Sequence, residues 1–409
     1  MILEKEPRYD MQKPPMRQHL RLLIWLLSWF VLRLHGSRIR RVGMEGVKGP
    51  YLLLCNHNAF MDFMVASHAL RFQRANFIVA IDGFIGREWL LRYIGCICTR
   101  KFVSDYTLVR HCKTVVERGD VVALYPEARY SLCGTTAVLP DSVGKLAKML
   151  GVPVVTLICH GHHVNSPFYH LPDHGVKCVE AEMRCIVSAD EIKTLKAPEI
   201  MQRIRDAFVY DDYRWQQEKH VRIRYKKRAE GLQKVLYQCP HCRTEYRMLT
   251  EGTRLSCGSC GKTWELDEYG KLHALEGETE FDHVPDWYEW ERANVRKEVE
   301  EGRYLLDVPA HVCALPNAKG YIPLGSCRLR HDMSGFHVTG TYEGEDYEIV
   351  RDARDIYSCH IEYEYLGKYG DCIDLNTKDN TYYIYPETPD CAVTKIALAT
   401  EELWEWSGK

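Results

Sequence analysis

Residues 51–62 read YLLLCNHNAFMD, and this stretch decides the fold of the N-terminal half of the chain. Five apolar residues run directly into a polar turn, and a helical pattern starts at Met61. Further apolar runs alternate with helical patterns, the runs at 76–80, 121–125, 152–158 and 178–187 and the helices at 61–70, 86–93, 106–118 and 144–150. Strands that alternate with helices are typical of α/β proteins. We therefore expect an α/β domain over residues 46–212.

Length and composition limit the classes of protein that fit. A chain of 409 residues is long enough for two or three domains. Its formal net charge of −2 argues against a protein that holds nucleic acid by bulk charge. Most of the 17 cysteines sit in apolar runs, which is typical of free thiols in a reducing compartment. We expect a protein that is cytosolic or faces the cytosol.

The N-terminal segment, residues 1–45, is basic and apolar. Between residues 11 and 44 there are seven basic residues and no acidic one. Residues 20–34 read LRLLIWLLSWFVLRL, which is shorter than the roughly 20 residues that span a bilayer. Arginines at both ends and two tryptophans favour a helix that lies in the membrane interface. The alternative is an amphipathic helix buried in the protein core.

His57 and Asp62 follow the first apolar run at a spacing of five residues. On one continuous helix this spacing would place them about 140° apart. They meet only if His57 lies in the turn before the helix and Asp62 in its first turns. A carboxylate bonded to one imidazole nitrogen leaves the other nitrogen free to accept a proton from an alcohol. The alternative is a structural histidine whose hydrogen bonds are satisfied.

Two later segments bring charged residues to the same sheet edge. Residues 121–131 read VVALYPEARYS, so Glu127 and Arg129 follow an apolar strand, where α/β proteins usually bind ligands. Residues 95–100 read GCICTR, and Arg100 ends this second strand-like run. Arginine at such a place suits the capture of phosphate. Both arginines can alternatively belong to surface ion pairs.

Taken in order, these residues resemble the glycerolipid acyltransferase family called PlsC, or lysophosphatidate (1-acylglycerol-3-phosphate) acyltransferase. The family motif N-H-x4-D is matched at Asn56, His57 and Asp62, and its glycine–hydrophobic–arginine motif at Gly95, Ile97 and Arg100. Its motif F-P-E-G-T-R-S is matched by YPEARYS at residues 125–131, and V-P-I-V-P is approached by VPVV at 152–155. The resemblance covers roughly residues 20–210.

The resemblance implies an O-acyltransferase at the cytoplasmic face of a membrane, bound peripherally or monotopically. It implies that His57 is the general base, oriented by Asp62, for transfer from acyl-CoA or acyl carrier protein to a lysophospholipid or glycerol-phosphate hydroxyl. It further implies that Arg100 and Arg129 hold the anionic head of the acceptor, and that Glu127 positions one of these cations or a hydroxyl. The sequence departs from the family at Ala128, where glycine is usual, and at Arg129, which stands one place early. Where the family commonly has a lysine-containing stretch after this motif, the chain reads LPDS at residues 139–142, and the acidic Asp141 is a poor phosphate partner. The altered motif and this stretch both affect the phosphate grip, so a lipid acceptor without phosphate stays open.

Residues 239–275 form a compact cysteine module. The spacing CxxC–x14–CxxC is supplied by Cys239, Cys242, Cys257 and Cys260. Two such pairs bring four thiolates to one metal ion in tetrahedral geometry, which predicts a zinc ribbon with one structural Zn²⁺ per chain. A pair of redox dithiols is the alternative. The ribbon also carries the second candidate class, a non-enzymatic adaptor for protein or nucleic acid, although the mixed charge of its flanks makes nucleic acid an unexpected partner.

The remaining segments predict a connector and a β-rich domain. The charge-rich pattern predicts a helical basic connector at 213–238, and residues 281–303 read as a further helix. Residues 304–395 carry alternating strands with turn signals, and 396–406 can be helical. In architecture, 281–409 resembles a small barrel of pleckstrin-homology or GRAM type, which binds lipid heads or proteins. A packing domain without a ligand is the alternative, and the oligomeric state is left open.

Overall fold

The computed structural model describes residues 6–170, 172–177 and 179–408. Its N-terminal half is built around one sheet, with the strand order β1-β7-β6-β2-β5-β3-β4. The central strands run parallel, while β7 is antiparallel to β6 and parallel to β1. The strands are β1 (Arg38–Val42), β2 (Leu52–Cys55), β3 (Ala75–Ala80), β4 (Ile97–Thr99), β5 (Val121–Leu124), β6 (Val154–His160) and β7 (Glu180–Val187).

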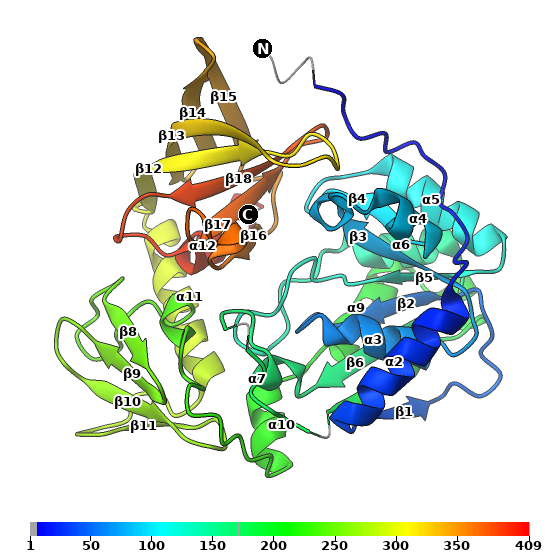
Figure 1. Ribbon diagram of the computed structural model, residues 1–409, viewed down its shortest axis with the longest axis horizontal. Helices are drawn as coiled ribbons and strands as arrows, with labels where there is room; N and C mark the ends of the chain where they lie inside the picture. Colours follow the sequence, from blue (N-terminus) through cyan, green and yellow to red (C-terminus); the bar gives the residue numbers. More distant parts are fainter. Residues whose placement is uncertain (1–5, 171, 178, 409) are drawn as a thin grey trace.

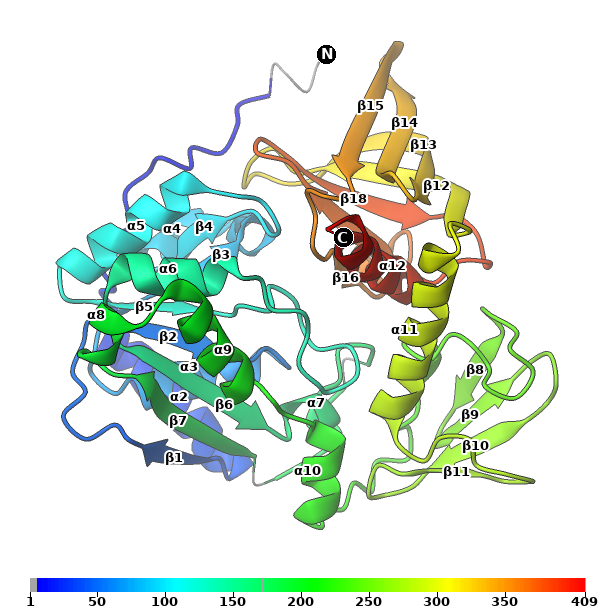
Figure 2. The same cartoon turned by 180° about the vertical axis from the view of Figure 1, so that it is seen from behind.

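Helices cover both faces of this sheet (Figures 1 and 2). Side chains of a strand alternate between faces, so Leu53 and Cys55 pack in one apolar cluster, and Leu52 and Leu54 in another. The first cluster includes residues of α2 (Arg21–His35) and α3 (Met61–Ala69), and the second includes residues of α5 (Tyr106–Glu117), α6 (Ser142–Leu150) and α9 (Ala197–Ala207). Burial on both faces explains why β2 is apolar throughout. The predicted α/β domain is confirmed, although the predicted start of β7 at residue 178 lies outside the described residues.

The apolar N-terminal segment forms the predicted helix, α2. It has 15 residues, of which only Ser28 and Leu32 are buried. Among the described residues, no helix is both long enough and apolar enough to cross a bilayer.

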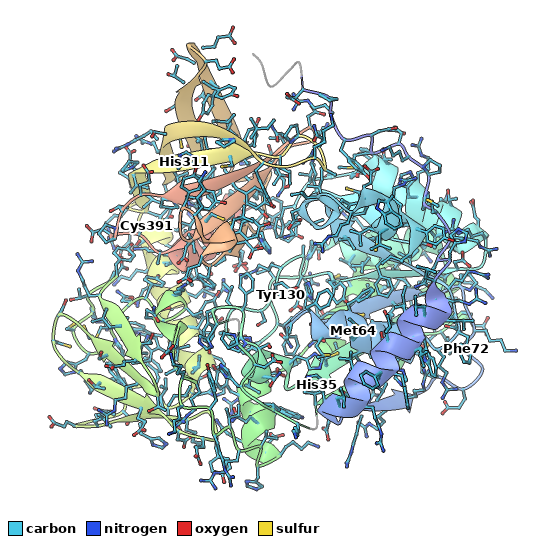
Figure 3. All side chains as sticks on the ribbon, in the orientation of Figure 1. His35, Met64, Phe72, Tyr130, His311 and Cys391 are labelled. Carbon is cyan, nitrogen blue, oxygen red and sulfur yellow. The ribbon has the colours of Figure 1, made fainter. Side chains whose placement is uncertain are left out.

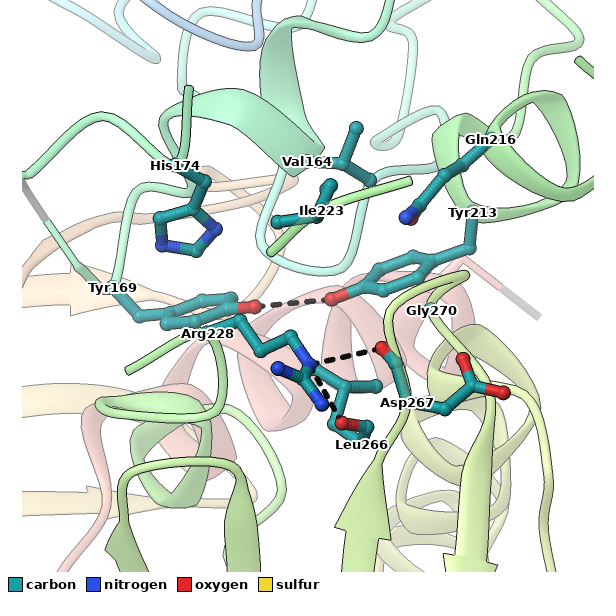
Figure 4. A pocket seen from close by; sticks show the side chains of 10 residues that line it. All are labelled: Val164, Tyr169, His174, Tyr213, Gln216, Ile223, Arg228, Leu266, Asp267 and Gly270. Carbon is teal, nitrogen blue, oxygen red and sulfur yellow. Dashed lines mark hydrogen bonds between the residues drawn. The ribbon is translucent and has the colours of Figure 1, made fainter. Parts of the chain in front are cut away.

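The cysteine module is a four-stranded antiparallel sheet in the order β11-β10-β9-β8. Its strands are β8 (Met248–Glu251), β9 (Arg254–Cys257), β10 (Thr263–Leu266) and β11 (Leu272–Ala274). Arg228, in the segment that precedes the module, holds it in place, because its Nε donates to the carbonyls of Leu266 and Asp267, at 2.7 and 3.0 Å. These groups line a cavity of about 20 Å³, drawn in Figure 4, which has room for roughly one water molecule.

The predicted helical connector at 213–238 is wrong over most of its length. Only α10 (Asp212–Glu218) is α-helical there, and a 3₁₀ turn spans Leu232–Lys234. The intervening chain is pinned by distant partners, such as the Ile223 N–H, which donates to the carbonyl of Glu268 at 2.8 Å. Buried apolar residues at 229, 232, 235 and 236 pack into the core rather than forming one face of a helix.

The C-terminal region is β-rich, as predicted, and begins and ends with a helix. It comprises α11 (Val284–Glu300), β12 (Leu305–Ala314), β13 (Ile322–Asp332), β14 (Gly335–Tyr342), β15 (Glu345–Asp352), β16 (His360–Glu362), β17 (Cys372–Asn376), β18 (Thr381–Pro386) and α12 (Val393–Ser407). The sheet order is β15-β14-β13-β12-β18-β17-β16, so β15 and β16 are its edges in the described chain. These strands form an open sheet, not the closed barrel expected from the pattern.

Candidate active site

The turn after β2 is fixed to the neighbouring strand by Asn56, which is fully buried. Its side-chain amide donates to the carbonyl of Cys159 at 2.8 Å and accepts from the Cys159 N–H at 2.7 Å. Cys159 lies near the end of β6, which pairs with β2. The carboxyl ends of these parallel strands therefore hold the next residue, His57, at the sheet edge where α/β proteins bind ligands.

His57 and Asp62 meet as the sequence predicts, because His57 lies in the turn and Asp62 in the first turn of α3. His57 Nδ1 is 3.5 Å from Asp62 Oδ2. This distance allows a strong electrostatic interaction but is longer than a good hydrogen bond. The same carboxylate oxygen accepts the N–H groups of Asn58 and Ala59, at 2.5 and 2.9 Å. Catalytic contacts of this kind often tighten only when substrate binds.

Asp62 has a second histidine partner, His162, which follows the end of β6. His162 Nδ1 hydrogen-bonds Asp62 Oδ1, and both side chains are buried. Burial alone would raise the pKa of Asp62, but the charge and hydrogen bond of His162, together with the closeness of His57, lower it below its usual value. Asp62 is therefore a carboxylate held between two imidazoles.

The ring of His57 lies between two tyrosines, Tyr125 at 4.2 Å and Tyr130 at 4.1 Å between ring centroids. The side chain keeps 23% of its surface exposed. Burial lowers the pKa of His57, although Asp62 opposes this shift. A neutral imidazole is therefore favoured near neutral pH. Within the described chain, its Nε2 has no hydrogen-bond partner, so it can accept a proton from a hydroxyl.

Glu127 supports His57 through its main chain. Its Oε2 accepts the His57 N–H at 2.8 Å, and its Oε1 accepts the N–H of Ala137 and the hydroxyl of Tyr210, both at 2.9 Å. Burial raises the pKa of Glu127 to about 7, despite the two backbone hydrogen bonds. The structure thus places Glu127 against the turn that carries His57, where it contacts neither of the predicted arginines by hydrogen bond.

The two arginines lie elsewhere, at contacts with the C-terminal region. Arg100 donates to three main-chain carbonyls and to the Thr381 hydroxyl, while Arg129 pairs with Glu401 at 2.7 Å. Both arginines are buried. Of the predicted site residues, the structure therefore brings together His57, Asp62 and Glu127, and it places Arg100 and Arg129 at the interface with α12 and β18.

The four predicted metal ligands come together in the cysteine module. The Sγ atoms lie within 4.8 Å of one another, with Cys239 and Cys260 at 3.8 Å and Cys242 and Cys257 at 3.7 Å. Four thiolates placed tetrahedrally at about 2.3 Å from a zinc ion would lie about 3.8 Å apart. The sulfur positions therefore fit Zn²⁺, which would be held by these four cysteines and would stabilise the module.

Two residues beside His57 were not singled out in the sequence. Tyr130 occupies the place where the family motif has arginine, and His162 belongs to the run HGHH at 160–163. The signal for His162 was available, since polar residues after a buried parallel strand lie at the ligand-binding edge. No local signal marked Tyr130 as a ring partner of His57.

The mixed α/β sheet thus carries a histidine–carboxylate pair at the carboxyl edge of its central parallel strands. Residues 31–160 match the family model described as Acyltransferase, and we call the N-terminal α/β half of the chain the acyltransferase domain. The matched segment contains His57, Asp62, Arg100, Glu127 and Arg129.

Among solved structures, the chain is similar to the 1-acyl-sn-glycerophosphate (LPA) acyltransferase PlsC from Thermotoga maritima. The two share 17% identity with a TM-score of 0.38, over 46% of this chain and 76% of that one. No curated protein sequence matches the chain significantly.

Proposed function

We propose that this protein transfers an acyl group from an acyl thioester, carried on CoA or acyl carrier protein, to a lipid hydroxyl at a membrane surface. The observation that carries the proposal is the His57–Asp62 pair, whose partly exposed imidazole has a free nitrogen at the ligand edge of the acyltransferase domain. This constellation suits general-base catalysis.

The chemistry follows from the two nitrogens of His57. Nε2 accepts the proton of the acceptor hydroxyl, whose oxygen attacks the thioester carbonyl. The new C–O bond forms as the C–S bond breaks, and the proton on His57 passes to the departing thiolate. Asp62 faces Nδ1 and stabilises the imidazolium that exists between these steps. No acyl-enzyme is required.

The exposed face of α2 supports placement at a membrane. Its outward apolar side chains are 44–63% exposed and comprise Leu22, Leu23, Leu26, Leu27, Trp29, Phe30 and Leu34. Phe60, three residues after His57, is 67% exposed. An apolar surface of this kind suits insertion into the acyl boundary of a bilayer. Two flanking arginines are already in ion pairs, Arg17 with Asp120 and Arg40 with Glu182. Membrane binding therefore depends more on the apolar face of α2 than on these flanking charges.

The adaptor alternative receives less support. Three basic residues of the cysteine module pair with acids, Lys262 with Glu280 at 2.7 Å, Arg247 with Asp390 at 2.7 Å and Lys271 with Asp282 at 3.3 Å. Paired cations are poor partners for phosphates.

The test is acyl transfer by the purified full-length protein. Labelled acyl-CoA and a panel of monoacyl lipids in vesicles should give a diacyl product. His57→Ala should lower the rate by about 10²–10⁴-fold, since it removes the base. His337→Ala, on β14, is the matched control and should keep full activity. Full activity of His57→Ala would reject the proposal.

A further inference from the structure

Arg100 directs four of its five N–H donors to the C-terminal region, while its buried Nε has no hydrogen-bond partner among the described residues. Its Nη1 donates to the Leu315 carbonyl at 3.1 Å and to Thr381 Oγ1 at 2.7 Å. Its Nη2 donates to the carbonyls of Pro316 at 3.0 Å and Asp379 at 3.1 Å. Four hydrogen bonds to neutral acceptors fix this guanidinium, so a ligand phosphate would have to break them.

Arg129 is held equally firmly, in a buried network around Glu401. Glu401 Oε1 accepts from Arg129 Nη2 and from the Ser358 hydroxyl, both at 2.7 Å, and Oε2 accepts from Arg292 at 2.7 Å. Removing one member of such a network would leave a buried charge unpaired. The pair therefore joins the acyltransferase domain to α12, and it uses Nη2 of Arg129, whereas Nε and Nη1 are buried with no hydrogen-bond partner among the described residues.

The C-terminal sheet brings a different set of charges toward His57. Lys101 Nζ lies 3.7 Å from Asp374 Oδ2, and the same oxygen lies 3.2 Å from His360 Nδ1. His360 Nδ1 is also 3.7 Å from Glu362 Oε1. We call these four residues the Lys101 cluster. Asp374 and His360 are buried, whereas Lys101 and Glu362 keep 15% and 16% of their side chains exposed.

A chain of aromatic rings connects this cluster to the catalytic histidine. The ring of Tyr130 is 4.1 Å from that of His57 and 5.1 Å from that of Phe168. Phe168 in turn lies 6.2 Å from His360. Figure 3 shows Tyr130 between the acyltransferase domain and the rest of the molecule. The cluster also acts on His57 electrostatically, since Lys101 and His360 both contribute to its lowered pKa.

The donors and acceptors of the Lys101 cluster are mixed. Two carboxylates, Glu362 and Asp374, accept hydrogen bonds, while Lys101 and His360 donate. His360 Nδ1 is buried and has no hydrogen-bond partner of good geometry among the described residues. A phosphate monoester would face two carboxylates with one lysine, and a cationic head would have to compete with Lys101 and His360, which already face those carboxylates. Hydroxyl groups both donate and accept, so they match this set without a net charge.

We infer that the acceptor is a lipid with an uncharged, hydroxyl-bearing head group, either glycerol itself or a sugar, and that the Lys101 cluster holds this head beside His57. Tyr130 and Phe168 offer aromatic faces against which the C–H face of such a head can pack. This inference rests on the proposed acyl transfer and names its acceptor class.

The test compares acceptors at equal surface concentration in vesicles, with the full-length protein and labelled acyl-CoA. The acceptors are monoacylglycerol, monoacyl galactosylglycerol, lysophosphatidate and lysophosphatidylethanolamine. We expect kcat/KM for one of the two uncharged lipids to exceed that for lysophosphatidate by about tenfold or more, since one lost hydrogen bond to a charged group costs about this factor. The better of the two uncharged lipids identifies the head.

Substitutions in the cluster give a second readout. Glu362→Gln should lower kcat/KM for the uncharged acceptor by about tenfold. Glu362→Lys should shift the preference toward lysophosphatidate, because it makes the cluster net positive. Neither change should alter KM for acyl-CoA, and Asp346→Asn on the exposed β15 serves as the control.

The outcomes separate the two proposals. A wild-type preference for lysophosphatidate or lysophosphatidylethanolamine would overturn the acceptor class and leave acyl transfer standing. No His57-dependent transfer to any of the four lipids would overturn both.

Discussion

Arg129 donates to Glu401 across 2.7 Å, although the two residues are 272 positions apart in the chain. Both side chains are buried, with 4% and 2% of their surfaces exposed. Burial would lower the pKa of Arg129, but the Glu401 carboxylate raises it above its ordinary value, so the pair is charged. A charge-assisted contact of this kind holds the acyltransferase domain against α12.

Glu401→Gln should destabilise the protein strongly, because Arg129 would stay buried without its counter-charge. We expect the free energy of unfolding to fall by about 3–5 kcal/mol, measured by chemical denaturation. The matched control is Asp141→Asn, which removes the exposed partner of Arg205 and should cost about 1 kcal/mol or less. Equal losses at the two positions would contradict a buried, structural pair.

The pH dependence of acyl transfer should report the ionisation of His57. Since burial lowers its pKa, kcat/KM should rise with pH through a midpoint below the ordinary value of 6.5 and level off above it. His162→Ala should move this midpoint upward, because the Asp62 charge would no longer be shared with His162 and would stabilise protonated His57 more. His162→Asn keeps a donor and should shift it less.

His163→Ala is the control for these profiles, since it removes a neighbouring buried imidazole whose ring contacts Tyr169 and Tyr213. If His162→Ala lowered the rate without moving the midpoint, His162 would have only a packing role.

Replacing Ala128 by glycine should stabilise the protein slightly. Its φ is +54°, a left-handed conformation that costs about 1–2 kcal/mol for a residue with a Cβ atom. Glycine avoids this cost, but it loses about 0.5–1 kcal/mol more conformational entropy on folding, which offsets part of the gain. We expect Ala128→Gly to raise the free energy of unfolding slightly, in a thermal unfolding experiment. Ala147→Gly, in the helix α6, should instead lower it by about 1 kcal/mol. If both glycine substitutions changed the free energy of unfolding in the same direction, the conformational explanation would be refuted.

Metal analysis of a freshly prepared, reduced sample should find one zinc per chain. Cys257→Ser removes one thiolate and should abolish stoichiometric zinc, whereas Cys327→Ser, on β13, should leave it unchanged. Chelation should speed hydrogen exchange over residues 239–275, because folding and metal binding are coupled in such modules. A zinc-free sample with a folded module would refute the ribbon.

The outward face of α2 should control binding to vesicles. Leu26 and Phe30 stand four residues apart, so they share one face of the helix and are 51% and 57% exposed. Leu26→Glu with Phe30→Glu should move the protein from floating vesicles to the soluble fraction and lower activity on bilayer substrate. Leu249→Glu changes an equally exposed leucine in the cysteine module and should change neither vesicle binding nor activity. Unaltered flotation of the double variant would place the membrane contact elsewhere.

Local patterns predicted the parts of the molecule that local chemistry determines. The apolar run at 51–55 and the polar turn after it were enough to place β2, His57 and the start of α3, because burial and helix periodicity act over a few residues. The basic run at 219–228 was wrongly predicted to be helical, since its hydrogen bonds are made with distant residues such as Glu268 rather than within a helix. The partners of Arg100 and Arg129 lie more than 200 positions away, and no local pattern reports a contact of that range.

The joint at Glu401 changes how the motif at residues 125–131 should be compared with its relatives. Scored column by column, YPEARYS is a degraded version of a phosphate-binding signature. The displaced arginine instead joins two parts of one polypeptide, and the ring of the tyrosine beside it packs against that of His57. A search for proteins that share this chain's chemistry should therefore require the arginine and a distant acidic helix together, and should not penalise the missing glycine.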